Sequence, residues 1–321
     1  MLRTLTGTGI FYQSDSLLKM KMSDVAMSPC TCQSARILVV EQIWDHLIRA
    51  ALREDLEAGD LTSELLFPSD ARAMASVYAR EEGILSGLDL AQRVFELLDE
   101  TVEFQPLKAD GDWIDSDEAV ARITARVRKL LAGERLALNL LMRLSGIATA
   151  TYRLQSRLRE KGLSARITDT RKTTPLWRFA EKKAVRHGGG VNHRMNLGDS
   201  ILIKDNHISL FGSAAEAVRR IRAQARHMDR IEVEVESIGQ IEPLLNAGAD
   251  IILLDNFTPE QVREAVRLIG DRAVIEVSGG VTPENIDDYA IEGVDVISLG
   301  WLTHSAPAIN FSMEILPEVR G

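Results

Sequence analysis

Cysteine is almost absent from this sequence: Cys30 and Cys32 are the only two among 321 residues, and both lie in the N-terminal stretch. No further pair of cysteines or histidines nearby completes a zinc site, so we interpret this Cys-X-Cys pair as two incidental thiols. A chain whose body contains no cysteine fits a reducing compartment. The cysteine content therefore favours a cytoplasmic protein.

Two further features are missing, a long hydrophobic run and an excess of positive charge. No stretch approaches the roughly 18 apolar residues that a membrane span needs. The formal net charge of −9 argues against a general role in binding nucleic acid or anionic membranes. Residues 1–35 also lack the continuous apolar core of a secretory signal, and we expect them to form a disordered extension.

An α+β region is expected first, with order beginning near Ile37. Two stretches, 73–79 and 119–127, alternate apolar and polar residues, which predicts half-buried strands with arginines on the exposed face. A helix is expected between them, from about Leu88 to Leu98. These elements predict an N-terminal domain, residues 36–140, built as an antiparallel α+β layer. The exposed arginines are Arg122, Arg126 and Arg128.

A long helix is predicted from Glu134 to about Lys161, because apolar residues recur there every three or four positions. We expect a break near Ser145-Gly146, where a glycine interrupts the pattern. The domain boundary is placed within this helix. A second domain then covers residues 141–305, and a C-terminal segment, 306–321, packs back on the first domain.

Beyond Gly162 the pattern changes to short apolar strands that alternate with amphipathic helices. Strands that are apolar on both faces and separated by helices predict a parallel sheet. Short helices and the absence of a GxGxxG fingerprint favour a closed (β/α) barrel over an open sheet. The predicted strands are ARITDT (165–170), SILIKD (200–205), RIEVEVE (230–236), DIILLD (250–255), AVIEVSGG (273–280) and VDVISLG (294–300).

The ends of these strands carry charged groups or glycines where a purely structural barrel needs none. In a parallel barrel the C-terminal ends of the strands meet at one face, where active sites lie. Six such ends in succession therefore predict a functional site at this face. The candidates are Arg171, Lys172, Lys204, Glu234, Asp255, Ser278, Gly279 and Gly300.

Two groups of residues point to an anionic ligand. The loops at Ser278-Gly279-Gly280 and Gly300 precede expected helix starts, the first near Thr282, and such loops bind phosphate through backbone N–H groups. Cations from neighbouring segments of an acidic protein predict a pocket for a ligand with several negative charges. These cations are Arg171, Lys172, His193, Arg194 and Lys204.

The third group is acidic, because Glu234 and Asp255 end successive predicted strands. Paired carboxylates beside a phosphate site suit Mg²⁺, which binds proteins through few ligands and several waters. They also suit direct stabilisation of a cationic transition state. The residues alone leave both alternatives open.

The stretch DTRKTTPLWRFAEKKAVRHGGGVNHRMNLGDSILIKDNHI, residues 169–208, closely resembles the quinolinate phosphoribosyltransferase family. The likeness extends to EDLEAGDLTSELL, GERLALNLLMRLSGIATAT, VEVE, LLDN, VSGG and ISLGWLTHSAPAINFS. It implies an N-terminal α/β sandwich, a C-terminal incomplete (β/α) barrel and a homodimer or higher homo-oligomer with shared active sites. It also implies transfer of phosphoribosyl from phosphoribosyl pyrophosphate to quinolinate with decarboxylation, giving nicotinate mononucleotide for NAD biosynthesis.

The resemblance assigns roles to the candidate residues. Basic side chains would hold quinolinate, a pyridine dicarboxylate, and the glycines of HGGGVNHR would let that loop fold onto it. A catalytic set would face the phosphoribosyl donor and its Mg²⁺, and three strand-end residues would bind the 5′-phosphate. The quinolinate-binding side chains would be Arg171, Lys172, His193 and Arg194, with Arg135 from a neighbouring subunit. The catalytic set would be Lys172, Lys204, Glu234 and Asp255, the last two holding the metal directly or through water. The residues that bind the 5′-phosphate would be Ser278, Gly279 and Gly300.

Three positions depart from the family pattern. Leu176-Trp177 stand where Gly-Leu is common, Val191 stands where histidine is common, and Glu57-Ala58 stand where a glycine is common. None of these departures removes a proposed ligand. The loop after Thr174 is the part of the chain that they affect most.

Three other functions fit parts of the pattern. A related phosphoribosyltransferase of the same fold would act on a different substrate. A Schiff-base aldolase would use Lys204 as its nucleophile, but it would leave Arg171 and Arg194 without a role. An anion sensor without catalytic activity would bind quinolinate and not convert it.

Overall fold

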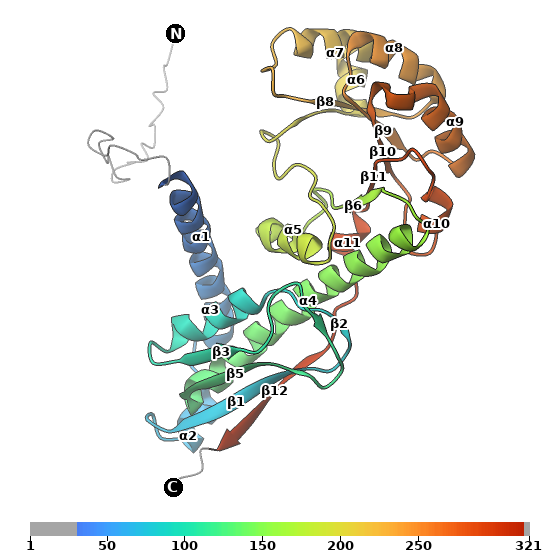
Figure 1. Ribbon diagram of the computed structural model, residues 1–321. Coiled ribbons are helices and arrows are strands. Elements are labelled where there is room, and N and C mark those ends of the chain that lie inside the picture. The colour runs from blue at the N-terminus through green and yellow to red at the C-terminus, as the bar shows by residue number, and fades with distance from the viewer. Residues whose placement is uncertain (1–30, 318–321) are drawn as a thin grey trace, which may run out of the picture. The chain divides into compact units, whose positions relative to one another are not determined.

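Figure 1 shows the computed structural model, which describes residues 31–317. The chain divides into two compact units, Met1–Trp44 and Asp45–Gly321. The helix α1 (Thr31–Leu56) begins in the first unit and starts before Ile37, so residues 31–35 of the predicted extension are helical. The rest of that extension, Cys30 and the side chain of Cys32 lie outside the described part of the chain.

A four-stranded antiparallel sheet, with the strand order β12-β1-β5-β3, forms the first layer of the second unit. The strand β12 comes from the C-terminal segment and pairs with β1 along its length, from Ala79↔Phe311 to Ala73↔Pro317. A helix, α3 (Leu88–Leu98), has the bounds that the sequence predicts. The strands are β1 (Arg72–Ala79), β3 (Glu103–Pro106), β5 (Ala119–Arg126) and β12 (Phe311–Pro317).

Three small elements complete this layer, namely α2 (Leu61–Leu66) and the paired strands β2 (Gly83–Ile84) and β4 (Trp113–Ile114). Asp60 caps α2, because its side chain accepts the Ser63 N–H at 3.1 Å. The antiparallel α+β layer predicted from the sequence is therefore confirmed.

The long helix α4 (Val127–Glu160) is continuous, so the break expected at Ser145-Gly146 is wrong. Both residues are buried, and a Cβ at Gly146 would lie 2.1 Å from the Pro307 carbonyl oxygen. The glycine therefore allows close approach of another segment and does not interrupt the helix. The helix also starts earlier than predicted, which places Arg128 in α4 and not on a strand.

Six parallel strands form the second sheet, in the order β6-β11-β10-β9-β8-β7. The strands β6 and β7 stand at its two edges, so the closed barrel favoured by the strand pattern is wrong. The incomplete barrel that the resemblance implies is confirmed. The strands are β6 (Arg166–Thr168), β7 (Ile201–Ile203), β8 (Ile231–Val235), β9 (Ile251–Asp255), β10 (Val274–Ser278) and β11 (Val296–Ser298).

Helices connect these strands, as expected for a parallel sheet. None of the helices within residues 31–317 combines the length and the apolar character that crossing a membrane requires. The connecting elements are α5 (Arg178–His187), α6 (Asp205–Phe211), α7 (Ala214–Arg222), η1 (Ile238–Gln240), α8 (Ile241–Ala247), α9 (Pro259–Ile269), η2 (Gly270–Arg272), α10 (Ile286–Tyr289) and α11 (Trp301–His304).

The three glycines of HGGGVNHR lie between β6 and β7. A Cβ at Gly188 would lie 2.2 Å from the Ala148 carbonyl oxygen of α4, and one at Gly190 would lie 3.0 Å from the Ile167 carbonyl oxygen of β6. Gly189 has a φ of 82°, which favours glycine. These glycines therefore let the loop pack against α4 and β6. The resemblance had instead implied that they let the loop fold onto the ligand.

Candidate active site

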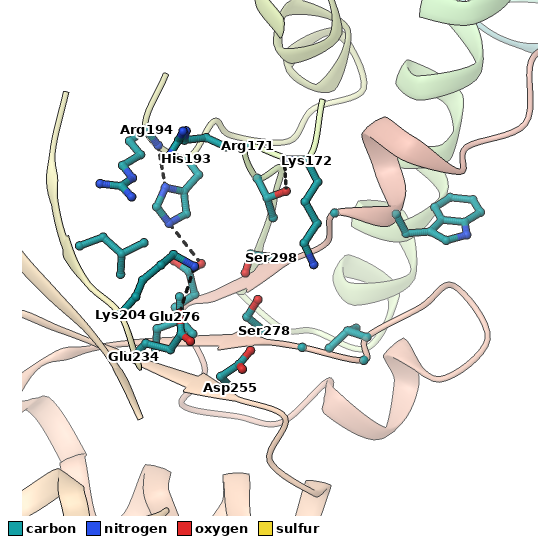
Figure 2. Close-up of a pocket in the computed structure, with 18 of the residues that line it drawn as sticks. Arg171, Lys172, His193, Arg194, Lys204, Glu234, Asp255, Glu276, Ser278 and Ser298 are labelled. Atoms are coloured by element: carbon teal, nitrogen blue, oxygen red, sulfur yellow. Dashed lines mark hydrogen bonds and ion pairs between the residues drawn. The ribbon is translucent and has the colours of Figure 1, made fainter. Parts of the chain in front are cut away.

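A cavity of about 600 Å³ opens at the C-terminal ends of the parallel strands. Figure 2 shows basic side chains on one side of it and carboxylates and serines on another. Residues that follow or end all six strands contribute to its wall, which is the geometry that a barrel active site requires. Ten of the eleven candidate residues line it: Arg171, Lys172, His193, Arg194, Lys204, Glu234, Asp255, Ser278, Gly279 and Gly300.

The eleventh candidate, Arg135, does not line this cavity. It lies in the N-terminal half of α4, and its side chain is exposed. A residue that serves the site of a neighbouring subunit must be available at the surface of its own chain. The position of Arg135 meets this requirement.

A buried ion pair fixes the loop that carries His193. The Lys182 ammonium of α5 contacts the Asp169 carboxylate, and both side chains are 0% exposed. Lys182 Nζ also donates to the His193 carbonyl oxygen at 2.9 Å. Asp169 accepts the His193 N–H at 3.1 Å and a hydrogen bond from the Asn192 amide. Burial raises the pKa of Asp169 and lowers the pKa of Lys182, and each charge opposes the shift of the other.

Contacts with α5 and α11 fix the loop that carries Lys172. The buried Glu181 carboxylate of α5 accepts the N–H and the hydroxyl of Thr174 at 3.0 and 2.8 Å. The Thr303 hydroxyl of α11 donates to the Lys172 carbonyl oxygen at 2.7 Å. A Cβ at Gly300 would lie 2.7 Å from Lys172 Cδ. Gly300 therefore leaves room for the lysine side chain to enter the cavity.

The Arg194 guanidinium reaches the cavity wall while the residue is only 9% exposed. Its Nη1 donates to the Ser200 carbonyl oxygen at 3.1 Å, whereas its buried Nε has no hydrogen-bond partner within residues 31–317. Burial and then the nearby Arg171 lower the pKa of Arg194, while Glu232 opposes this effect. The guanidinium places a positive charge at the cavity wall, which suits an anionic ligand.

Carboxylates and a lysine form the opposite wall. Lys204 Nζ donates to Glu234 Oε2 at 3.1 Å. Burial raises the pKa of Glu234, Lys204 opposes this shift, and Asp255 adds to it. The Asn256 amide donates to Asp255 Oδ2 at 2.7 Å. Two carboxylates are thus held at the ends of adjacent strands, β8 and β9, as the sequence predicts.

The loop after β10 brings backbone close to these carboxylates. Gly279 has a φ of 77°, and a Cβ there would lie 2.6 Å from Asp255 Oδ1 and from the Asn256 nitrogen. Only glycine fits this position. The helix expected to start near Thr282 is the short α10, which begins later, at Ile286.

Two buried carboxylates beside His193, Glu232 and Glu276, were not among the residues predicted from the sequence; they are 4% and 5% exposed. Glu276 lines the cavity, as does His304 of α11. The missed pattern is a glutamate inside an apolar strand, two residues before a candidate: Glu232 before Glu234, and Glu276 before Ser278. Alternate residues of a strand point to the same face, so this spacing places each glutamate below its candidate.

Family models match the chain over most of its described length. The model of the quinolinate phosphoribosyl transferase N-terminal domain matches residues 60–145, and the C-terminal domain model matches residues 147–314. The chain belongs to the quinolinate phosphoribosyltransferase family. The family resemblance predicted from residues 169–208 is therefore confirmed.

Other members of the quinolinate phosphoribosyltransferase family resemble the chain over most of its length. A probable nicotinate-nucleotide pyrophosphorylase (carboxylating) from Bacillus subtilis is 44% identical over 262 residues, which are 82% of this chain and 90% of that protein. The human nicotinate-nucleotide pyrophosphorylase (carboxylating) is 35% identical over 273 residues, 84% and 90% of the two chains. The crystal structure of NadC from Streptococcus pyogenes has a TM-score of 0.80 and 40% identity, and covers 91% of this chain and 99% of its own.

One departure from the quinolinate phosphoribosyltransferase pattern has a local consequence. Leu176, which stands where glycine is common, has a φ of 69° and is 76% exposed. A leucine in this left-handed region is strained, whereas a glycine is not. Val191 is half-buried and forms a bridge with Thr168 of β6. Neither residue displaces a cavity side chain.

Proposed function

We propose that this chain transfers the phosphoribosyl group of phosphoribosyl pyrophosphate to quinolinate, releasing pyrophosphate and CO₂ and forming nicotinate mononucleotide. Its relatives are named nicotinate-nucleotide pyrophosphorylase (carboxylating). The observation that carries the proposal is the composition of one cavity, where two arginines, Arg171 and Arg194, share the wall with paired carboxylates and a glycine-rich loop.

The basic side of the cavity suits a small aromatic dicarboxylate. The guanidinium groups of Arg171 and Arg194 offer planar donor pairs that match carboxylates. His193 and Lys172 lie on the same wall. Arginines that grip two carboxylates also fix the plane of the pyridine ring, and hence the direction in which its nitrogen points.

The phosphoribosyl donor fits the other side. Ser278, Gly279 and Gly300 present hydroxyl and backbone groups to the 5′-phosphate. Glu234 and Asp255 offer hard oxygen ligands on adjacent strands, which is the donor set that Mg²⁺ prefers. Burial raises the pKa of Glu234 and Asp255 adds to the shift, so a cation bound here would favour the charged carboxylate. When bound, Mg²⁺ would neutralise charge on the pyrophosphate.

The side chains support a reaction without a covalent enzyme intermediate. As the bond between ribose C1 and pyrophosphate breaks, positive charge develops on the sugar, and Glu234 and Asp255 stabilise it. Lys172 and Lys204 neutralise the departing pyrophosphate. The pyridine nitrogen bonds to C1 and becomes positive, which stabilises the carbanion left when the adjacent carboxylate departs as CO₂. That ring carbon then takes a proton from water, which gives nicotinate mononucleotide. The arginines hold the ring for both steps.

The purified protein is expected to consume quinolinate with phosphoribosyl pyrophosphate and Mg²⁺, and not to consume nicotinate. Nicotinate lacks the second carboxylate that the paired arginines are placed to bind, and it has no carboxylate to lose beside the nitrogen. Product formation is followed as nicotinate mononucleotide and CO₂. Turnover of nicotinate, or of neither acid with the phosphoribosyl donor still bound, would contradict the quinolinate assignment.

We further propose that the protein acts as a homodimer or higher homo-oligomer in the cytoplasm, with Arg135 completing a neighbour's site. An equal mixture of Arg135→Ala and Lys204→Ala chains, each inactive alone, is expected to regain about a quarter of the wild-type activity after subunit exchange. Half of the dimers are then mixed, and each mixed dimer has one intact site. Activity that stays at the level of the separate variants would show that sites are not shared.

A further inference from the structure

Two buried carboxylates, Glu232 and Glu276, lie beside the ring of His193. Figure 2 shows His193 and Glu276 in the cavity wall. His193 Nε2 lies 3.3 Å from Glu232 Oε2 and 3.7 Å from Glu276 Oε1. Glu232 and Glu276 belong to β8 and β10, which lie on either side of β9 in the sheet. The three groups therefore come from elements that the parallel sheet brings together.

In this cluster one imidazole contacts two buried carboxylates. Glu276 Oε1 is buried and has no hydrogen-bond partner within the described part of the chain. Burial and then Glu232 raise the pKa of Glu276 to about 7. His193 and a hydrogen bond with Ser298 oppose this shift, and Asp169 adds to it. Two carboxylates beside one imidazole favour a proton on the ring nitrogen that faces them.

Both ring nitrogens of His193 are occupied by the protein. Nδ1 accepts the N–H of Arg194 at 2.7 Å, so it carries no proton in this arrangement. The ring proton is then on Nε2, directed at the two carboxylates. Burial lowers the pKa of His193, but Glu232 and Glu276 together outweigh burial, and the net pKa is raised. A second proton would have to enter at Nδ1 and would break the contact with Arg194.

We propose that Glu232 and Glu276 are positioning residues, which fix the ring of His193 and, through its Nδ1, the backbone of Arg194. The guanidinium of Arg194 is thereby held at the cavity wall, where it faces the substrate carboxylates. The chain of contacts runs from the carboxylates to the His193 ring and then to the Arg194 N–H. The inference rests on the proposed dicarboxylate site.

The Glu276→Gln variant tests this assignment, because it removes the charge and keeps the size of the side chain. We expect kcat/KM for quinolinate to fall about 10- to 100-fold, because the substitution removes one of the two acidic groups that hold the His193 ring. KM for phosphoribosyl pyrophosphate is expected to stay within about twofold of the wild type, because the donor side is untouched. Glu242→Gln is the matched control, since Glu242 pairs with Arg272 at 2.8 Å, away from the cavity.

A second measurement does not depend on substrate turnover. In nitrogen-15 spectra of the wild-type protein, His193 is expected to show a protonated Nε2 and an unprotonated Nδ1 at neutral pH. Replacing both carboxylates, in a Glu232→Gln/Glu276→Gln double variant, should mix the two tautomers, because a glutamine amide can donate to Nε2 as well as accept from it. These spectra decide the positioning role even if the wild-type protein fails to convert quinolinate, in which case the proposed function fails by itself.

Three results would overturn the proposal. One is a kcat/KM for quinolinate in Glu276→Gln equal to that of Glu242→Gln. Another is a variant in which kcat/KM falls equally for quinolinate and for phosphoribosyl pyrophosphate and thermal stability falls as well, which would indicate a merely structural role. The third is a stoichiometric metal ion in the purified protein that Glu276→Gln removes, since the three ligand atoms lie within 4.8 Å of one another.

Discussion

Replacing Lys182 with Met is expected to lower the free energy of unfolding by about 3–5 kcal/mol, the cost of breaking a buried ion pair by removing one partner. The change leaves the Asp169 carboxylate buried without its cation, because both side chains of the pair are 0% exposed. It also removes the hydrogen bond to the His193 carbonyl oxygen. Urea unfolding of the variant and the wild type measures the difference.

The neighbouring Lys183→Met is the matched control for this prediction. Lys183 pairs with Asp89 at 2.5 Å, but their side chains are 37% and 54% exposed. Such a surface pair contributes about 0–1 kcal/mol. Adding Asp169→Asn to Lys182→Met is expected to recover part of the loss, because the unpaired charge is removed. Equal losses in the two lysine variants would show that the buried pair does not anchor the loop.

The second large effect is expected for Asp255→Asn, which should reduce kcat with quinolinate by about 10²- to 10³-fold. The substitution removes one of the two carboxylates that we assign to the developing positive charge and to Mg²⁺. It keeps the shape of the side chain at the end of β9. The dependence of the rate on Mg²⁺ concentration should shift to higher concentrations, which steady-state kinetics with varied Mg²⁺ measures.

Asp250 provides the control for that variant, because it lies just before the opposite end of β9. Its carboxylate contacts Arg222 and accepts the Ile231 N–H at 2.7 Å. These contacts lie at the N-terminal ends of the strands, whereas the cavity lies at their C-terminal ends. Asp250→Asn is expected to reduce stability and leave kcat within about twofold of the wild type. A similar loss of kcat in both variants would remove the special role of Asp255.

Much of the fold could be predicted from the sequence, because local patterns of apolar residues determine where helices and strands form. The bounds of α3 at Leu88 and Leu98 follow from the helical period, and the six parallel strands follow from their apolar runs. Strand ends of a parallel sheet share one face, so the sequence also predicted that residues as distant as Arg171 and Gly300 meet in one cavity. The motif in residues 169–208 identified the family.

The tertiary structure decided what depends on contacts between distant segments. The pairing of Lys182 with Asp169 and the meeting of Glu232 and Glu276 at His193 join elements that no local pattern relates. Gly146 illustrates the same limit, because its close neighbour, Pro307, is far away in the sequence. Period and propensity report how one segment folds, whereas burial, charge pairing and the opening between β6 and β7 arise only when segments pack together.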